Sequence, residues 1–221
     1  MGKLAGPATR VADKALVLWP RRGYDVGIEK KSNNLASLFG IDRGRARFQP
    51  RREVRVLDRL GTVAVVGVGL IGGSIGLALR GRGLASTVVG VGRDMRALDE
   101  ARSRGVIDRA TTDLAEGVAE ADVVVVCTPV GRIALDVRRA AEAAPRTALI
   151  TDAGSTKRRI VEEVEQTPRA AEQFVAAHPL AGSERSGSAF ARADLFRDRV
   201  CVLTPSPRAR SGRPWDAEFS R

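Results

Sequence analysis

The chain has 221 residues, of which 43% are hydrophobic and 4% aromatic, and its formal net charge is +11. This length suits one domain with a buried core, and one histidine with two cysteines is too few for a Cys/His zinc site, so we expect no metal centre. Residues 1–60 hold 14 Lys or Arg against 6 Asp or Glu, residues 208–221 hold 4 against 2, and the middle therefore holds 19 against 18. The middle of the chain is nearly neutral and has few aromatic side chains, which argues against nucleic-acid binding. Binding of nucleic acid by the two basic ends is kept as the last alternative.

The first 56 residues show no sustained hydrophobic periodicity, and Pro, Gly and Arg interrupt them throughout. We therefore predict an irregular N-terminal extension over residues 1–56. An alternative is that translation begins near Arg55 instead. The segment is rich in arginine but also carries acidic residues, which is poor for a transit peptide, and no signal-peptide pattern begins the chain. With Cys127 and Cys201 as free thiols, these features predict a cytoplasmic protein.

Residues 62–80 read TVAVVGVGLIGGSIGLALR and contain a G-x-G-x-x-G motif. The β-branched start predicts a strand over 62–67, and the later apolar residues predict a helix over 70–82. Between a strand and a helix this motif is typical of a dinucleotide site, because its glycines allow the turn, the approach of a pyrophosphate and close helix–strand packing. The glycines are Gly67, Gly69 and Gly72, and the helix start adds Leu70 and Ile71.

The same stretch is nearly free of charge, which is also a feature of membrane spans. Its many glycines would weaken a lone helix, and its β-branched residues gather at one end. No second apolar stretch of that length follows. We therefore predict that the chain has no membrane-spanning segment.

Beyond residue 82, short apolar runs alternate with helix-compatible stretches. Strands that are apolar on both faces and alternate with helices predict a parallel sheet covered on both sides. The expected fold over residues 57–205 is α/β, a doubly wound, mostly parallel Rossmann sheet, with an irregular tail over 206–221. The predicted strands are 62–67, 87–91, 109–112, 123–127, 148–150, 174–177 and 200–203, and the predicted helices are 70–82, 95–104, a short one from Asp113, 131–143, one from about Ser155, and 188–195.

The end of the second strand bears on the choice of dinucleotide. Gly92 lies 20 residues after Gly72, where an NAD site would place an acidic residue for the ribose 2′-hydroxyl. Arg93 follows instead, and an arginine there can hold a 2′-phosphate, so the sequence leaves both NAD and NADP open. Asp94 is predicted to cap the next helix.

Three later strands also end in residues suited to a ligand site. Pro129, after Thr128, cannot continue the fourth strand and turns the chain across the sheet edge. Asp152 and Ser155 follow the fifth strand, where a turn residue and a helix N-cap explain them equally well. The single histidine, His178, ends the sixth strand, and imidazole is suited to taking a proton from an alcohol near neutral pH. A lone histidine is otherwise an ordinary surface or core residue.

Four segments carry a more specific signal together: Val65–Ser74, Cys127–Val130, Thr151–Lys157 and His178–Glu184. They resemble the prephenate/arogenate dehydrogenase family. The glycine turn alone is shared by many dehydrogenases, whereas D-x-G-S-x-K followed by H-P-x-A-G-S-E at this spacing is far more specific. The resemblance covers roughly residues 55–205.

The resemblance implies an NAD(P)-dependent enzyme that oxidises the ring carbinol of prephenate or arogenate and releases CO2, on the route to tyrosine. It implies that His178 takes the hydroxyl proton as hydride leaves, and that Ser155 lies beside the same hydroxyl. Ser183, Glu184 and Arg185 match residues near the site entrance, and Arg185 stands where many members carry lysine. The implied cofactor-binding residues are Gly67, Gly69, Leu70, Ile71, Gly72, Arg93, Thr128, Pro129 and Asp152.

One departure from the family pattern affects the expected activity. In the family a helical domain follows the sheet domain, forms a homodimer and supplies an arginine for the substrate carboxylate. This chain turns to Pro, Arg, Ser and Gly after residue 205, which predicts a truncated or frame-shifted product with impaired catalysis. Two alternatives are an NAD(P)-binding module without catalysis and another hydroxyacid or imine oxidoreductase with the same cofactor domain.

Overall fold

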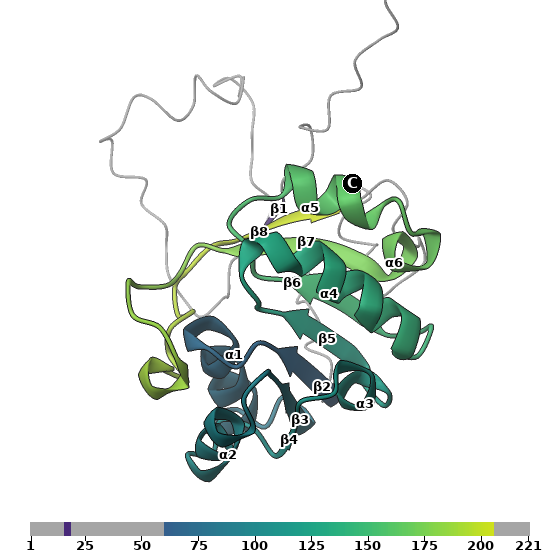
Figure 1. The fold of residues 1–221 in the computed structure, drawn as a ribbon. Coiled ribbons are helices and arrows are strands. Elements are labelled where there is room, and N and C mark those ends of the chain that lie inside the picture. Colours follow the sequence, from purple (N-terminus) through teal and green to yellow (C-terminus); the bar gives the residue numbers. More distant parts are fainter. Residues whose placement is uncertain (1–15, 19–59, 206–221) are drawn as a thin grey trace, which may run out of the picture.

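The computed structural model describes residues 16–18 and 60–205 of the chain. In this part a single sheet has the order β1-β8-β7-β6-β5-β2-β3-β4 (Figure 1). The six strands β7, β6, β5, β2, β3 and β4 are parallel to one another, whereas β8 runs antiparallel to β7, and β1 runs antiparallel to β8. The expected doubly wound, mostly parallel sheet is confirmed. The bounds are β1 Leu16–Leu18, β2 Leu60–Val66, β3 Ala85–Val91, β4 Arg109–Thr111, β5 Val123–Val126, β6 Leu149–Asp152, β7 Phe174–Pro179 and β8 Cys201–Pro205.

Successive residues of the central strand β2 enter two different cores, because side chains alternate between the faces of a strand. Val63 and Val65 belong to one buried cluster, and Ala64 and Val66 belong to the other. This double burial explains why the strand has an unbroken apolar sequence instead of an alternating one.

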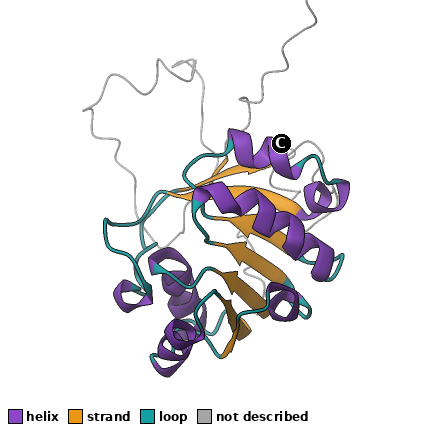
Figure 2. Ribbon diagram, in the orientation of Figure 1, coloured by secondary structure: helices purple, strands orange, loops and turns teal. Residues whose placement is uncertain are grey.

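Helices cover both faces of the sheet (Figure 2). On one face, α1 (Leu70–Gly81) and α2 (Met95–Ser103) contribute to the cluster that contains Val63 and Val65. The other cluster takes residues from α3 (Leu114–Val118), α4 (Val130–Ala143), α5 (Arg158–Val164) and α6 (Pro168–Gln173). No helix of the described residues is both long and apolar enough to cross a membrane.

Some elements differ from those expected. The helix α6 was not predicted, and the helix expected from about Ser155 begins at Arg158. The expected helix over 188–195 is a single 3-10 turn, η1 (Ser188–Phe190), because Ala191 leaves the helical region with φ −63° and ψ 142°. The strand β1 lies in the N-terminal extension that was predicted to be irregular, while the rest of 1–56 and the predicted tail 206–221 are outside the described residues.

Residues 180–200, here named the β7–β8 loop, connect the two strands by way of α1 (Figure 1). The backbone N–H of Arg192 donates to the hydroxyl of the fully buried Ser74, at 2.9 Å. At Gly73 a Cβ would lie 2.9 Å from Cβ of Ala191, so the helix has no room for a side chain there. The Arg104 guanidinium donates to the carbonyl of Ala189 at 2.9 Å. The loop therefore crosses from the β7 edge of the sheet to the helices of its first half.

Candidate active site

The glycine turn joins β2 to α1 at the carboxyl edge of the sheet. Gly67 has φ +95°, which favours glycine, and a Cβ there would lie 2.9 Å from the carbonyl of Cys127. A Cβ at Gly72 would lie 2.2 Å from the carbonyl oxygen of Gly67. The first and third glycines of the motif therefore permit the turn and the close contact of helix with strand, as the motif predicts.

The N-terminus of α1 is open at Gly69. This N-cap residue makes no side-chain cap hydrogen bond, no acidic residue lies in the first turn, and a Cβ at Gly69 would meet no described atom within 4 Å. Leu70, Ile71 and Gly72 form the first turn, whose backbone N–H groups point out of the helix end. A phosphate fits such an end, because unpaired N–H groups and the positive end of the helix dipole favour an anion.

Arg93 follows β3, and its side chain is exposed and has no hydrogen bond or ion pair within the described part of the chain. Asp94 caps α2 as predicted, because its carboxylate accepts from the N–H of Arg96 at 2.9 Å. The carboxylate of Asp94 is therefore already bonded to the backbone, whereas the guanidinium of Arg93 has no partner among the described residues.

Thr128 and Pro129 follow β5, beside the glycine turn. Pro129 is the N-cap residue of α4 and has no side chain that could cap it. The hydroxyl of Thr128 is buried and has no hydrogen-bond partner among the described residues. Such a hydroxyl costs free energy unless a ligand or water bonds to it. Next to it, burial and the nearby charge of Asp152 raise the pKa of the Cys127 thiol to about 12, so this thiol stays protonated.

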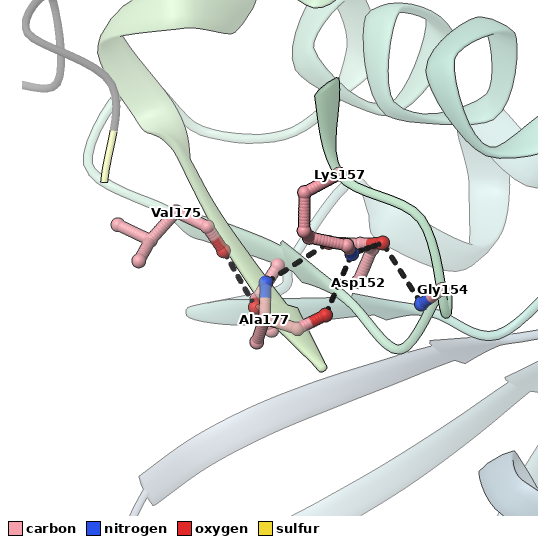
Figure 3. Close-up of polar contacts among 6 residues, drawn as sticks. Asp152, Gly154, Lys157, Val175 and Ala177 are labelled. Atoms are coloured by element: carbon pink, nitrogen blue, oxygen red, sulfur yellow. Dashed lines mark hydrogen bonds and ion pairs between the residues drawn. The ribbon is translucent and has the colours of Figure 1, made fainter. Parts of the chain in front are cut away.

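Asp152 and Lys157 hold the end of β7 through its backbone (Figure 3). The buried Asp152 carboxylate accepts from the N–H of Gly154 at 2.9 Å and from the N–H of Ala177 at 3.0 Å, and it pairs with the Lys157 ammonium. That ammonium also donates to the carbonyl of Ala177 at 2.7 Å. The N–H and the carbonyl of Ala177, the residue before His178, are thus both hydrogen-bonded by the Asp152–Lys157 ion pair. Lys157 is a site residue that sequence reasoning missed, although it ends the quoted D-x-G-S-x-K segment.

His178 lies on β7, opposite Val202 of β8, and is partly buried. Its pKa is lowered by burial and by the positive charge of Lys157, while the carboxylate of Asp152 opposes this shift. The imidazole is therefore neutral at pH 7 and able to accept a proton. The backbone of His178 also hydrogen-bonds the half-buried Cys201 thiol, whose pKa burial raises.

A pocket of about 440 Å³ opens at His178. Its other walls come from Pro179 at the end of β7 and from the β7–β8 loop, and Gly182 lies near the glycine turn, because a Cβ at Gly182 would lie 3.7 Å from Cδ1 of Ile71. The pocket therefore lies between the histidine and the open end of α1. Its lining residues are His178, Pro179, Leu180, Ala181, Gly182, Leu195 and Arg199. Leu195 and Arg199 were not predicted, since no local pattern marks them.

The remaining predicted residues are exposed. Ser155 lies in the connection between β6 and α5 and does not cap that helix, whose N-cap residue is Lys157. Ser183, Glu184 and Arg185 lie on the β7–β8 loop, where the Ser183 hydroxyl accepts from the N–H of Arg185 at 3.2 Å. The guanidinium of Arg185 lies 5.1 Å from the ring centre of Phe190. None of these four residues lines the pocket of His178 in the described structure.

A family model described as the nucleotide-binding domain of prephenate dehydrogenase matches residues 75–215. The chain belongs to the prephenate dehydrogenase family. The resemblance seen in the sequence motifs is thereby confirmed, and the matched family domain is a nucleotide-binding domain.

Curated relatives in the family have similar levels of identity. The prephenate dehydrogenase of Bacillus subtilis (strain 168) is 36% identical over 148 residues, which are 66% of this chain and 40% of that protein. The cyclohexadienyl dehydrogenase of Zymomonas mobilis is 33% identical over 144 residues, which are 65% of this chain and 48% of that protein. The chain thus spans less than half the length of these relatives.

Solved structures agree with this family. Prephenate dehydrogenase from A. aeolicus, in complex with hydroxyphenyl propionate and NAD+, has a TM-score of 0.63 at 28% identity and matches 68% of this chain and 52% of that one. Synechocystis arogenate dehydrogenase has a TM-score of 0.62 at 32% identity, again over 68% of this chain and 52% of that one.

Proposed function

We propose that this domain takes part in the NAD(P)-dependent oxidation of prephenate or arogenate, with His178 as the proton acceptor. The observation that carries the proposal is the position of His178, in a pocket whose Gly182 lies against Ile71 of the glycine turn. A proton acceptor and a dinucleotide site at one edge of a sheet are the two parts that a hydroxyl-oxidising dehydrogenase needs.

The residues at this edge fit a dinucleotide. The N–H groups at the start of α1 would hold the pyrophosphate, and the buried Thr128 hydroxyl would find there the partner that the described residues do not give it. Arg93 would hold a 2′-phosphate if the dinucleotide is NADP. When bound, the nicotinamide supplies the acceptor for hydride.

In the proposed reaction the C–H bond at the ring carbinol breaks with its electron pair leaving as hydride, and His178 takes the proton of the hydroxyl, which leaves a ring ketone. The C–C bond to the ring carboxylate then breaks and CO2 leaves. The released electron pair makes the ring aromatic and displaces the C=O pair onto oxygen, which takes the proton back from His178 as a phenol. The neutral state of His178 at pH 7 suits this role, because a protonated imidazole could not accept the proton. Ser155 is proposed to assist at the hydroxyl, as the family resemblance implies.

The test is prephenate-dependent reduction of NAD and of NADP by the purified chain, compared with a His178→Asn variant. We expect turnover to fall by about 10²–10⁴-fold, the contribution typical of a general base, while titration shows unchanged cofactor binding. Arg158→Ala is a matched control, since Arg158 is exposed and pairs only with Glu162 on α5. Full turnover by His178→Asn would contradict the assignment of the proton acceptor.

We also propose a cytoplasmic location and, by analogy with the family resemblance, a homodimer. The free thiols of Cys127 and Cys201 support a reducing compartment. Cell fractionation and sedimentation of the purified chain test these two statements separately.

A further inference from the structure

The pocket beside His178 contains one side chain whose charge no described residue neutralises. Arg199 lines the pocket, and its exposed guanidinium makes no hydrogen bond or ion pair within residues 60–205. Two other arginines of the β7–β8 loop have a partner within that loop. Arg192 forms two bonds of 3.0 Å with the Asp194 carboxylate, and Arg185 lies over the ring of Phe190.

A hydrogen-bonded turn fixes the position of the Arg199 backbone. The preceding residue, Asp198, has φ +56°, a left-handed conformation that few residues other than glycine adopt. The N–H of Arg199 donates to the carbonyl of Phe196 at 3.2 Å, and the next residue, Val200, accepts from the N–H of Leu180 at 2.8 Å. This tight turn and the bond to Leu180 hold the backbone of Arg199 at the pocket. Arg197, two residues earlier, does not line the pocket.

The composition of the pocket selects for one chemical class of ligand. No carboxylate lines it, and its walls include the apolar side chains of Leu180, Pro179 and Leu195. A guanidinium beside apolar walls suits a ligand with an apolar ring and a carboxylate, because arginine binds carboxylates through paired N–H donors. His178, at the same pocket, can bond a ring hydroxyl.

We propose that Arg199 binds a carboxylate group of the substrate in the pocket beside His178. This inference deepens the proposed function and rests on it for the identity of the substrate. It supplies a cationic contact from the sheet domain itself, through a residue to which the sequence motifs assign no role.

The test measures binding and needs no turnover. The probes are hydroxyphenyl propionate and its neutral amide, hydroxyphenyl propionamide, titrated into the 221-residue chain at pH 7.5. His178 is the only histidine of the chain, so its imidazole resonances in an NMR spectrum report binding in this pocket without ambiguity. The variants are Arg199→Ala, Arg199→Lys and the matched control Arg197→Ala, whose parent residue is exposed and two positions away.

We expect the wild-type chain and Arg197→Ala to bind the carboxylate about tenfold more tightly than the amide, a modest factor because the guanidinium is exposed. Arg199→Ala should lose this preference by weakening only the carboxylate, and Arg199→Lys should keep part of it. The proposal is overturned if the wild type shows no preference, or if Arg199→Ala weakens both probes equally or neither. If Arg199→Ala loses the carboxylate preference while His178→Asn keeps full turnover, the proposed function fails and the role of Arg199 stands.

Discussion

At the scale of single residues, the ion pair of Asp152 and Lys157 provides the backbone of β7 with hydrogen-bond partners where the neighbouring strand β6 has ended. The ladder between β6 and β7 pairs Thr151 with Val175, and β6 ends one residue later. Beyond that point the side chains of the pair bond the N–H and carbonyl of Ala177, as a neighbouring strand would have done. The position of His178 therefore depends on two charged side chains, one at the end of β6 and one in the connection that follows it.

Lys157→Met should raise the pKa of His178. The variant removes a positive charge that lowers this pKa and leaves the Asp152 carboxylate, which raises it. Nearby, the Cys201 thiol bonds the backbone of His178, and Arg199 lines the same pocket. An NMR titration of the single histidine measures the shift directly, and Arg158→Met serves as the control because Arg158 is exposed on the outside of α5. An unchanged or lower pKa in Lys157→Met would show that Lys157 does not act on the imidazole.

Arg93→Asp should change the preference between the two dinucleotides. A carboxylate at this strand end repels a 2′-phosphate and accepts a hydrogen bond from a ribose 2′-hydroxyl. We expect the dissociation constant of NADP to rise by at least about tenfold relative to that of NAD, since one charge-assisted hydrogen bond contributes about 1.5–3 kcal/mol. Fluorescence titration with both dinucleotides measures the ratio, and Arg102→Ala is a control on α2, the helix that follows Arg93, where Arg102 pairs with Asp99. Equal effects on NAD and NADP would rule out a role for Arg93 in this choice.

At the scale of elements, local patterns predicted what local forces determine. The apolar runs of β2 and β5 and the cap of α2 by Asp94 follow from the residues themselves. The short α6 was missed because its start signal, Thr167 followed by Pro168, precedes only six helical residues. Arg199 was missed because its place in the pocket depends on the antiparallel return of β8, which no sequence period encodes.

The contact between β2 and α1 sets a strict limit on side-chain size. Gly72→Ala places a Cβ 2.2 Å from the Gly67 carbonyl oxygen and 2.8 Å from a methyl group of Val65, so helix and strand must separate. We expect a loss of about 1–3 kcal/mol in the free energy of unfolding, the usual effect of overpacking. Gly81→Ala at the last position of α1 is the control, because a Cβ there meets no described atom within 4 Å. Urea unfolding of both variants measures the difference, and equal stabilities would contradict the close packing.

At the scale of the whole molecule, His178 links folding to pH. Its folded-state pKa lies below the ordinary value of 6.5, so the unfolded chain binds the proton more tightly than the folded chain does. Stability from this residue is therefore complete above pH 6.5 and is lost as the pH falls through the folded-state pKa.

We expect the free energy of unfolding to decrease between pH 7 and pH 5.5, and His178→Gln to flatten this decrease because glutamine does not titrate. Urea unfolding at several pH values measures both slopes. Most carboxylates titrate below this window, which leaves the single histidine as its main contributor. Identical slopes for the two chains would mean that His178 has the same pKa in the folded and unfolded states.

The return of β8 to the sheet also bears on how this enzyme family can change its substrate. The β7–β8 loop leaves and re-enters the sheet at one hydrogen-bonded point, where Leu180 donates to Val200. This single stretch supplies every pocket wall beyond β7, whereas the glycine turn lies more than a hundred residues earlier in the chain. Mutations that alter the pocket can thus accumulate in one continuous segment while the glycine turn stays intact. A grafted loop from a relative needs to keep its contacts with Gly73 and Ser74 of α1 and with Arg104 to follow the same path.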